Sequence, residues 1–215
     1  MSATKPLQPR RRPKQERARL TQQAILDAFV RLLLEKGYAR LTIRDIADLA
    51  GVGLGTVYEH FPGKKSIAAN CIHQRFKAVA MEAEAVVAAL QGRSADEMIA
   101  ALLDLFVALH RDKPLEWNAL IFLERQVSDE AAWRALYGHF VDLWQRALQA
   151  SDWADEAAAR EAAYVIHAAV YGFLYQTLML RPEAVAAPLF RQQLGLLVQG
   201  FTNAQNASQS GKMHL

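Results

Sequence analysis

Two short segments with helical spacing of apolar residues flank a three-residue turn, and this arrangement constrains the fold more than any other feature of the sequence. The first segment covers residues 42–50, and the second covers residues 54–61 and is closed by Pro62. Only residues 51–53 separate them, and five of the eleven glycines fall between residues 37 and 63. Two short helices that pack their apolar faces across such a turn form a helix-turn-helix.

A longer helix is predicted to precede this pair. Within residues 17–36, apolar side chains recur at the i, i+4, i+7 and i+8 spacing of one helical face, and Gly37 ends the segment. These side chains are Ile25, Phe29, Leu32 and Leu33. Thr42 and Asp45, three residues apart, predict a capping box at the start of the next helix.

The rest of the chain also predicts helices, because no segment alternates apolar and polar residues over the length of a strand. Helical spacing and chain breaks place them at residues 64–90, 94–111, 115–126, 129–150, 155–180 and 184–204. The expected fold class is therefore all-α. The expected organisation is a disordered basic arm over 1–14, a helix-turn-helix domain over 15–63, a helical bundle over 64–204 and a flexible tail over 205–215.

The charge of the chain is unevenly distributed. Residues 1–65 carry 13 Lys and Arg against 6 Asp and Glu, a net charge of +7, whereas residues 66–215 carry 12 against 16, a net charge of −4. A basic first third favours a polyanionic partner for that end of the chain. Two interpretations of the arm over residues 1–14 stay open: a solvated tail, or an additional contact to DNA phosphate or the minor groove.

Several classes of protein are disfavoured. Cys71 is the only cysteine, so an internal disulfide and a cysteine-based zinc cage are excluded, and a reducing, cytoplasmic compartment is the simplest interpretation. Residues 162–180 are apolar enough for a membrane span, but their many small residues favour a helix buried in a bundle or a dimer interface. No Glu-x-x-His pair, glycine-rich phosphate loop or G-x-S-x-G elbow occurs, so neither an enzyme nor a metal or cofactor site is expected.

Two stretches of sequence carry a resemblance to a known family. The run LTIRDIADLAGVGLGTVYEHFPGKKSI over residues 41–67 resembles the DNA-binding signature of TetR-family transcriptional regulators almost position for position. The preceding AILDAFVRLLLEKGY over residues 24–38 resembles the first helix of that family. The resemblance covers about residues 17–70, and it implies an N-terminal three-helix DNA-binding domain followed by a helical ligand-binding and dimerisation domain.

The resemblance also implies roles for individual residues on the two short helices. Tyr58 and His60 would contact phosphates, and Thr56 would contact a phosphate or a base edge. Arg44 would reach the major groove, where arginine pairs with guanine. Physical reasoning places Val57 and Phe61, spaced i and i+4, on the core side of the second short helix.

The remaining candidates for DNA contact flank these positions. Lys64 would touch phosphate, and Lys65, which stands where the family usually has an acid, is a candidate for an additional phosphate contact. Gly55 would let the backbone approach DNA closely. The main role expected of Thr42 is that of a helix cap, and a phosphate contact is its second expected role. Two departures complete the set: Gly53 replaces the family's usual serine, and Leu54, in place of a polar residue, could contact only a thymine methyl group.

The second half of the chain is rich in aromatic residues, most of which are expected to be core. Relatives bind a small, often apolar effector between these helices, so polar groups among the aromatic residues are candidates for a pocket. The candidates are His110, Trp117, Asn118, Tyr137, Tyr164, His167 and Tyr171. A lone histidine such as His167 is also compatible with a satisfied core position. Ala168 and Gly172, spaced i and i+4, mark a smooth strip that the resemblance places in a homodimer interface.

The function expected from these features is that of a ligand-responsive transcriptional regulator. Its expected partners are double-stranded DNA with a palindromic operator, a small and largely apolar effector, and a second copy of the chain. Repression released by the effector is the favoured mode, and activation stays open. The alternative is a helical ligand-binding or protein-interaction module without sequence-specific DNA binding.

Overall fold

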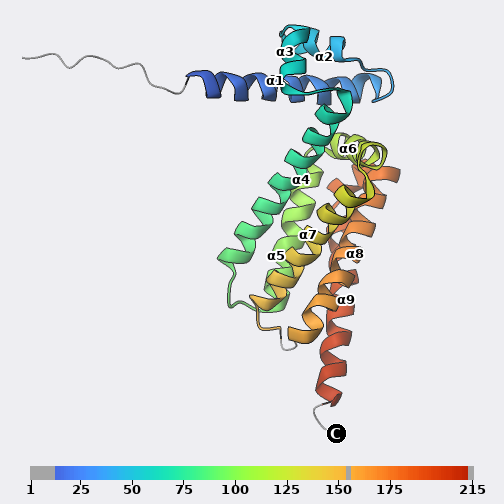
Figure 1. Ribbon diagram of the computed structural model, residues 1–215. Helices are drawn as coiled ribbons and strands as arrows, with labels where there is room; N and C mark the ends of the chain where they lie inside the picture. Colours follow the sequence, from blue (N-terminus) through green and yellow to red (C-terminus); the bar gives the residue numbers. More distant parts are fainter. Residues whose placement is uncertain (1–12, 154–155, 213–215) are drawn as a thin grey trace, which may run out of the picture. The chain divides into compact units, whose positions relative to one another are not determined.

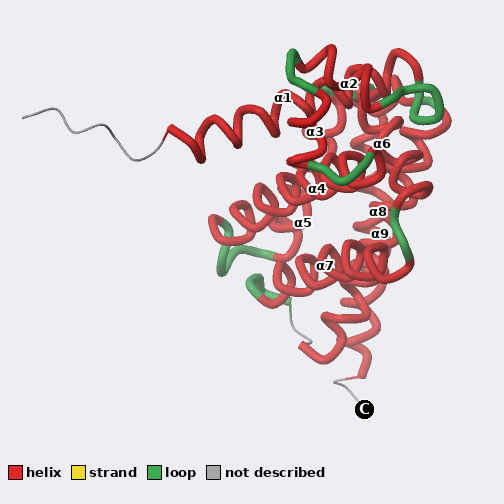
Figure 2. Tube along the Cα trace, turned by 45° about the horizontal axis from the view of Figure 1, so that its top comes forward, coloured by secondary structure: helices red, strands yellow, loops and turns green. Residues whose placement is uncertain are grey.

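The structure is a computed structural model that describes residues 13–153 and 156–212. Every regular element among these residues is a helix, as Figures 1 and 2 show. The predicted all-α class is therefore confirmed. The predicted arm covers residues 1–14. Residues 1–12 lie outside the described part of the chain, and the first helix, α1, begins at Pro13.

The chain divides into two compact units, Met1–Cys71 and Ile72–Leu215. The division falls inside helix α4 (Lys64–Ala89), two turns after its start. The sequence predicts a domain boundary between residues 63 and 64. The first unit instead includes the beginning of α4, where Ile67 and Ala68 are completely buried and Cys71 Sγ lies 3.9 Å from the Leu26 carbonyl oxygen of α1.

The first unit is a small helical domain built from α1 (Pro13–Lys36), α2 (Ile43–Ala50), α3 (Leu54–His60) and the first two turns of α4. Its core is formed by Ile25, Phe29, Val57 and Phe61, which the predicted periodicities place inward, together with Ile46 of α2, all at most 2% exposed. Gly37 and Gly51, which end α1 and α2, have φ angles of 74° and 67°. Glycine adopts this left-handed conformation without the penalty that a Cβ atom imposes.

The second unit is a helical bundle. It contains the rest of α4 followed by α5 (Ala95–Arg111), α6 (Pro114–Val127), α7 (Glu130–Gln149), α8 (Glu156–Leu180), a short 3-10 helix η1 (Pro182–Ala186) and α9 (Pro188–Lys212). The predicted helices agree with α4 to α8 to within two residues at each end. Helices α7 and α8 pack against each other more extensively than any other pair of elements.

The end of the chain differs from the sequence-based expectation in two ways. The single helix predicted over residues 184–204 is preceded by η1, and α9 continues to Lys212, where we had expected a flexible tail from residue 205. Polar composition alone does not end a helix. Residues 203–212 contain no proline, and alanine and glutamine, which favour helices, recur among them.

Candidate functional site

The start of α2 is fixed by the predicted capping box. Thr42 Oγ1 accepts a hydrogen bond from the Asp45 backbone N–H at 3.1 Å, and the Asp45 carboxylate accepts one from the Thr42 N–H at 2.9 Å. The hydrogen bond from the Thr42 N–H and the nearby Lys36 ammonium lower the pKa of the Asp45 carboxyl group to about 2. The Thr42 hydroxyl also donates to Asp45 at 2.9 Å. Its hydrogen-bonding capacity is thus used to set the helix, so Thr42 is a cap in this structure.

Helix α3 has one buried and one exposed side. Val57 and the following Phe61 are buried, as predicted, whereas Tyr58 is 52% exposed and Leu54 is 38% exposed. Thr56 and His60 are half-buried at the boundary. Gly53 is the N-cap and makes no side-chain capping bond. Because the apolar side is fixed in the core, the exposed side is presented to solvent on a rigid support.

Three exposed positions complete the candidate DNA-contacting surface on this unit. Arg44 is exposed on the first turn of α2, and Lys65 is exposed on the first turn of α4. Gly55 is exposed on α3, and a Cβ atom built there would meet nothing within 4 Å. Arg44 and Lys65 make no ion pair among the described residues, so their charges are open to a polyanion.

Lys64 differs from the expectation that it contacts phosphate. Its Nζ atom donates to the backbone carbonyl oxygens of Tyr38 at 2.9 Å and Leu41 at 3.1 Å, and it lies 4.5 Å from the centre of the Tyr38 ring. The side chain therefore binds the loop between α1 and α2 and satisfies two carbonyl oxygens of that loop. In this structure Lys64 is a structural cation, and Lys65 beside it is the exposed one.

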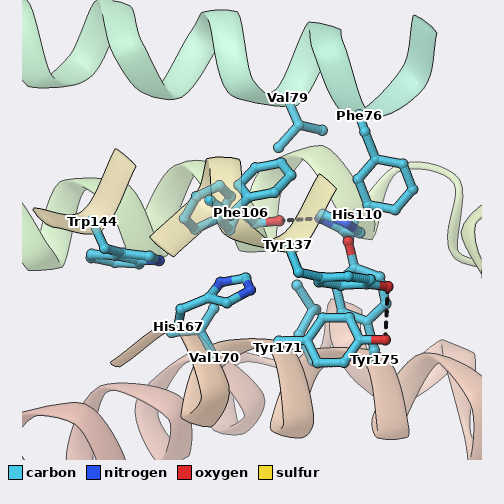
Figure 3. A pocket seen from close by; sticks show the side chains of 12 residues that line it. Phe76, Val79, Phe106, His110, Tyr137, Trp144, His167, Val170, Tyr171 and Tyr175 are labelled. Carbon is cyan, nitrogen blue, oxygen red and sulfur yellow. Dashed lines mark hydrogen bonds between the residues drawn. The ribbon is translucent and has the colours of Figure 1, made fainter. Parts of the chain in front are cut away.

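The second unit contains a cavity lined by residues of α4, α5, α7 and α8 (Figure 3). Four of the predicted pocket residues line it: His110, Tyr137, His167 and Tyr171. Tyr137 donates a hydrogen bond to the Tyr171 hydroxyl at 2.9 Å, and the Tyr171 and Tyr175 rings are 4.4 Å apart. Burial raises the pKa of Tyr137 and of Tyr175 above the usual range, so both are neutral hydroxyls at physiological pH.

The other three predicted pocket residues lie elsewhere. Trp117 is buried with its Nε1 atom donating to the Leu109 carbonyl oxygen at 3.0 Å, and Asn118 donates to the Leu178 carbonyl oxygen at 2.7 Å. Both serve helix packing rather than the cavity, because their donors are already satisfied by backbone. Tyr164 is 60% exposed on the surface of α8 and does not line the cavity.

Sequence reasoning missed most of the apolar wall of the cavity. Phe76 and Val79 come from α4, Phe106 from α5 and Tyr175 from α8. Their periodicity marks them as inward-facing, but an inward-facing residue in the core and one at the edge of a cavity give the same sequence pattern. Only the packing of four helices around one space distinguishes them.

The two histidines of the cavity are held in the neutral state. Burial lowers the pKa of His110 to about 4, and burial likewise lowers the pKa of His167 to about 4. His110 Nδ1 lies 2.6 Å from the Phe106 carbonyl oxygen, to which it must donate, so its Nε2 atom is left as a hydrogen-bond acceptor. That Nε2 atom is buried without a hydrogen-bond partner among the described residues.

The low pKa values of these two histidines predict that the second unit is less stable at mildly acidic pH. Between pH 6.5 and 4 the unfolded chain binds protons at both positions and the native bundle does not, so stability falls as the pH falls. At pH 5 the loss is about 2 kcal/mol for each histidine. All four tryptophans lie in the second unit, so urea unfolding followed by tryptophan fluorescence at pH 7 and pH 5 measures it. His110→Phe should reduce the difference by about half, and His73→Phe, at an exposed position, should not.

The exposed surface of α8 and α9 is unusually apolar. The predicted strip is accessible: Ala168 is exposed, and a Cβ atom at the half-buried Gly172 would meet nothing within 4 Å. Large exposed apolar side chains on the two helices are Tyr164, Val165, Leu180, Leu189, Leu196 and Leu197. Segment Ala158–Leu180 is the one helix among the described residues long and apolar enough to cross a membrane, and a third of the window that meets this criterion is buried.

The described residues contain no group of three or more His, Cys, Asp and Glu that could hold a metal ion. The polar atoms gathered in the cavity are tyrosine hydroxyls and neutral imidazoles, and no acid or lysine lines it. The sites of this chain are thus an exposed basic helical surface in the first unit and an apolar cavity in the second.

A helix-turn-helix domain followed by a helical bundle is the architecture of a class of transcriptional regulators, and the comparisons with known proteins agree with it. The family described as bacterial regulatory proteins, tetR family, matches residues 25–71. The transcriptional regulator CymR of Pseudomonas putida is 33% identical over 98 residues, which are 46% of this chain and 47% of CymR. TtgR of Pseudomonas putida is 44% identical over 57 residues, 26% of this chain and 27% of TtgR. The matches thus span about half or less of these relatives.

Solved structures extend the likeness of the fold over most of the chain. A putative transcriptional regulator from Pseudomonas aeruginosa has a TM-score of 0.67 at 23% identity, covering 92% of this chain and 93% of its own. FadR from Bacillus subtilis, solved in complex with stearoyl-CoA, has a TM-score of 0.65 at 19% identity, covering 83% and 98%. In sequence, residues 25–71 are similar to the tetR family of bacterial regulatory proteins, and in fold most of the chain is similar to solved transcriptional regulators.

Proposed function

We propose that this protein is a cytoplasmic, homodimeric transcriptional repressor that leaves a palindromic operator when a small, largely apolar effector enters the second unit. The observation that carries the proposal is helix α3, whose buried Val57 fixes it to the core while Tyr58 is exposed beside the exposed Leu54. A helix held in this way can enter the major groove without losing its own packing. The sequence similarity to regulatory proteins over the same residues supports this use.

The proposed DNA contacts fall into two groups. Arg44 is assigned to a base edge, because an arginine pairs with guanine O6 and N7 through two donors. Tyr58, His60 and Lys65 are assigned to phosphates, which position the domain without reading sequence. Thr56, Gly53, Leu54 and Gly55 line the same helix and its N-cap, where close approach of the backbone matters more than side-chain chemistry.

Dimerisation is proposed through α8 and α9. Two recognition helices must enter successive major grooves about 34–36 Å apart, which a single chain with one such helix cannot do. The exposed apolar side chains of these two helices, together with Ala168 and Gly172, supply a surface that gains stability when covered by a second copy.

The proposed link between effector and DNA is helix α4. Its first eight residues belong to the first unit, and Phe76 and Val79 in its later turns line the cavity of the second. An effector that prefers one position of these side chains therefore biases the helix that also carries part of the DNA-binding domain. The size of the response is limited by the difference in effector affinity between the two states.

In vitro selection of duplexes from a random pool tests this function. A dimeric repressor should recover an inverted repeat, and its affinity should fall steeply with salt through counterion release. Weak, equal binding to all duplexes would favour the alternative of a ligand-binding or protein-interaction module. Release of the selected duplex by small molecules then tests the effector response.

Arg44→Ala should lower discrimination between the selected duplex and a scrambled one by about 10- to 100-fold, because the lost contact distinguishes bases by about 1–3 kcal/mol. Competition binding at fixed salt measures the ratio. Lys65→Ala is the matched control, since losing a phosphate contact should weaken both duplexes alike. Equal losses on both duplexes for Arg44→Ala would remove Arg44 from the set of base contacts.

A further inference from the structure

The cavity in the second unit is too small, as it stands, for the effector that the proposed function requires. Its free volume is about 30 Å³, room for about two water molecules. Pockets for small molecules usually measure about 300–1,000 Å³. A ligand must therefore displace side chains or occupy a neighbouring space.

A neighbouring space of the right size lies between α4 and α7. This groove has a free volume of about 480 Å³ and is lined mainly by apolar groups, among them Ala80, Met81 and Leu136. Phe76 of α4 and Phe140 of α7 line both the groove and the inner cavity. Their ring centres are 6.1 Å apart in an edge-to-face contact, so both spaces share this pair of rings as part of their walls.

We propose that the groove and the inner cavity form one ligand site gated by Phe76 and Phe140, and that its ligand is a neutral aromatic molecule whose hydroxyl donates a hydrogen bond to His110 Nε2. This inference rests on the proposed function, because it specifies the effector class of the same site. None of the groove residues apart from these two rings belongs to the inner cavity.

The aromatic part of this ligand class follows from the walls. Phe76 also stacks on Tyr175, with ring centres 6.3 Å apart and an interplanar angle of 14°, and Phe106 contacts Phe140 edge to face at 6.4 Å. A ligand ring that moves Phe76 or Phe140 aside can replace these ring contacts with equivalent ones. An aliphatic ligand would lose the electrostatic component of these ring–ring contacts.

The hydroxyl and the neutral charge follow from His110. Its Nδ1 proton is committed to the Phe106 carbonyl oxygen, and its buried Nε2 is an acceptor without a partner (Figure 3). A ligand donor would give this buried acceptor the hydrogen bond that it lacks in the free protein. No Asp, Glu, Lys or Arg lines the inner cavity, and Lys77 and Glu84 line only the groove, so an ionic group in the inner cavity would be desolvated without a counter-charge beside it. Glu124, whose Oε1 is also buried without a partner, is not part of the lining.

Three matched probes test the ligand class on the full-length protein without DNA: 4-ethylphenol, ethylbenzene and 4-ethylbenzoate. Isothermal titration calorimetry should show 4-ethylphenol binding about fivefold to tenfold more tightly than ethylbenzene, the value of one net hydrogen bond, with 4-ethylbenzoate weakest. His110→Phe should bring the ratio of the first two close to one, whereas His167→Phe should retain it. A ratio that survives in His110→Phe, or tightest binding of the benzoate, would overturn the assignment.

A second measurement keeps the test decisive if His110→Phe does not fold. In wild-type protein, the ¹⁵N resonance of His110 Nε2 should shift on binding 4-ethylphenol and not on binding ethylbenzene. The gate is tested by Phe140→Ala, which should speed the association of both probes about tenfold. Leu136→Ala, which lines the groove alone, should not. Unchanged rates in Phe140→Ala, or no binding of any probe to wild type and Phe140→Ala, would refute the gated site.

The outcome is separable from that of the proposed function. If no duplex is selected and the phenol still discriminates at His110, the repressor proposal fails and the ligand site stands. If an operator is selected and the probes do not bind, the ligand class fails and the DNA-binding proposal stands.

Discussion

Gly172→Glu should convert the protein into a monomer and weaken its binding to the selected duplex by at least about 100-fold. The free chain tolerates the change, because a Cβ atom at Gly172 meets nothing within 4 Å and glutamate favours a helix more than glycine does. In the dimer the carboxylate would be buried without a partner, so association becomes unfavourable. A monomer binds one half-site at a time, so it loses the affinity that a dimer gains by binding two linked half-sites at once. Light scattering and duplex titration measure the two effects.

Gly138→Glu is the matched control for this prediction. Gly138 is also within a helix, α7, is exposed, and has open space where a Cβ atom would be. This variant should stay dimeric and bind the duplex as wild type does. A Gly172→Glu protein that remains a tight dimer would place the interface on another surface of the bundle. Ala168→Glu should behave as Gly172→Glu does, since it lies one turn away on the same helix.

Lys64→Ala should destabilise the first unit by about 2 kcal/mol. The ammonium group donates to two backbone carbonyl oxygens and lies over the Tyr38 ring, and hydrogen bonds from a charged donor are individually worth about 1.5–3 kcal/mol before exposure reduces them. Hydrogen exchange of backbone amides in α1 and α2 measures the change, because these helices flank the loop that Lys64 holds.

Lys65→Ala provides the comparison at the next residue. It is exposed, so hydrogen exchange should be unchanged, while the dependence of duplex affinity on salt should fall by about one counterion. If Lys64→Ala instead left hydrogen exchange at the wild-type level and lowered only the salt dependence, Lys64 would be a phosphate contact, as the family resemblance implies. The pair of variants thus decides between a structural and a DNA-binding cation.

The first unit shows how far local patterns reach. Val57 and Phe61 were predicted to face inward from their spacing alone, and the capping box of Thr42 and Asp45 from residue types three positions apart. These features depend on interactions within one or two helical turns, so the sequence contains all the information that they need. Lys64 does not belong to this group. Its partners are 23 and 26 residues away, and no local pattern links a lysine to a distant carbonyl group.

The second unit shows where such patterns stop. Helix periodicity identified inward-facing residues, and four of the seven predicted pocket residues do line the cavity. The side chains of Trp117 and Asn118 instead donate hydrogen bonds to backbone carbonyl oxygens of other helices, and Tyr164 faces solvent. Phe76 and Phe140 give the same pattern as any core phenylalanine, although both line two spaces. Whether a side chain fills a core, borders a cavity or gates it depends on where four helices meet.

The amino-acid sequence by itself determined the helices up to α8, the cap of α2, the turns that follow α1 and α2 and the exposed side of α3, because each is set by residues close together in the chain. Tertiary structure alone decided that Lys64 binds a loop, that the cavity between four helices is small and that a larger groove shares two phenylalanine rings with it. Volumes and long-range hydrogen bonds arise from packing between distant segments, and packing is a property of the folded chain rather than of any stretch of it.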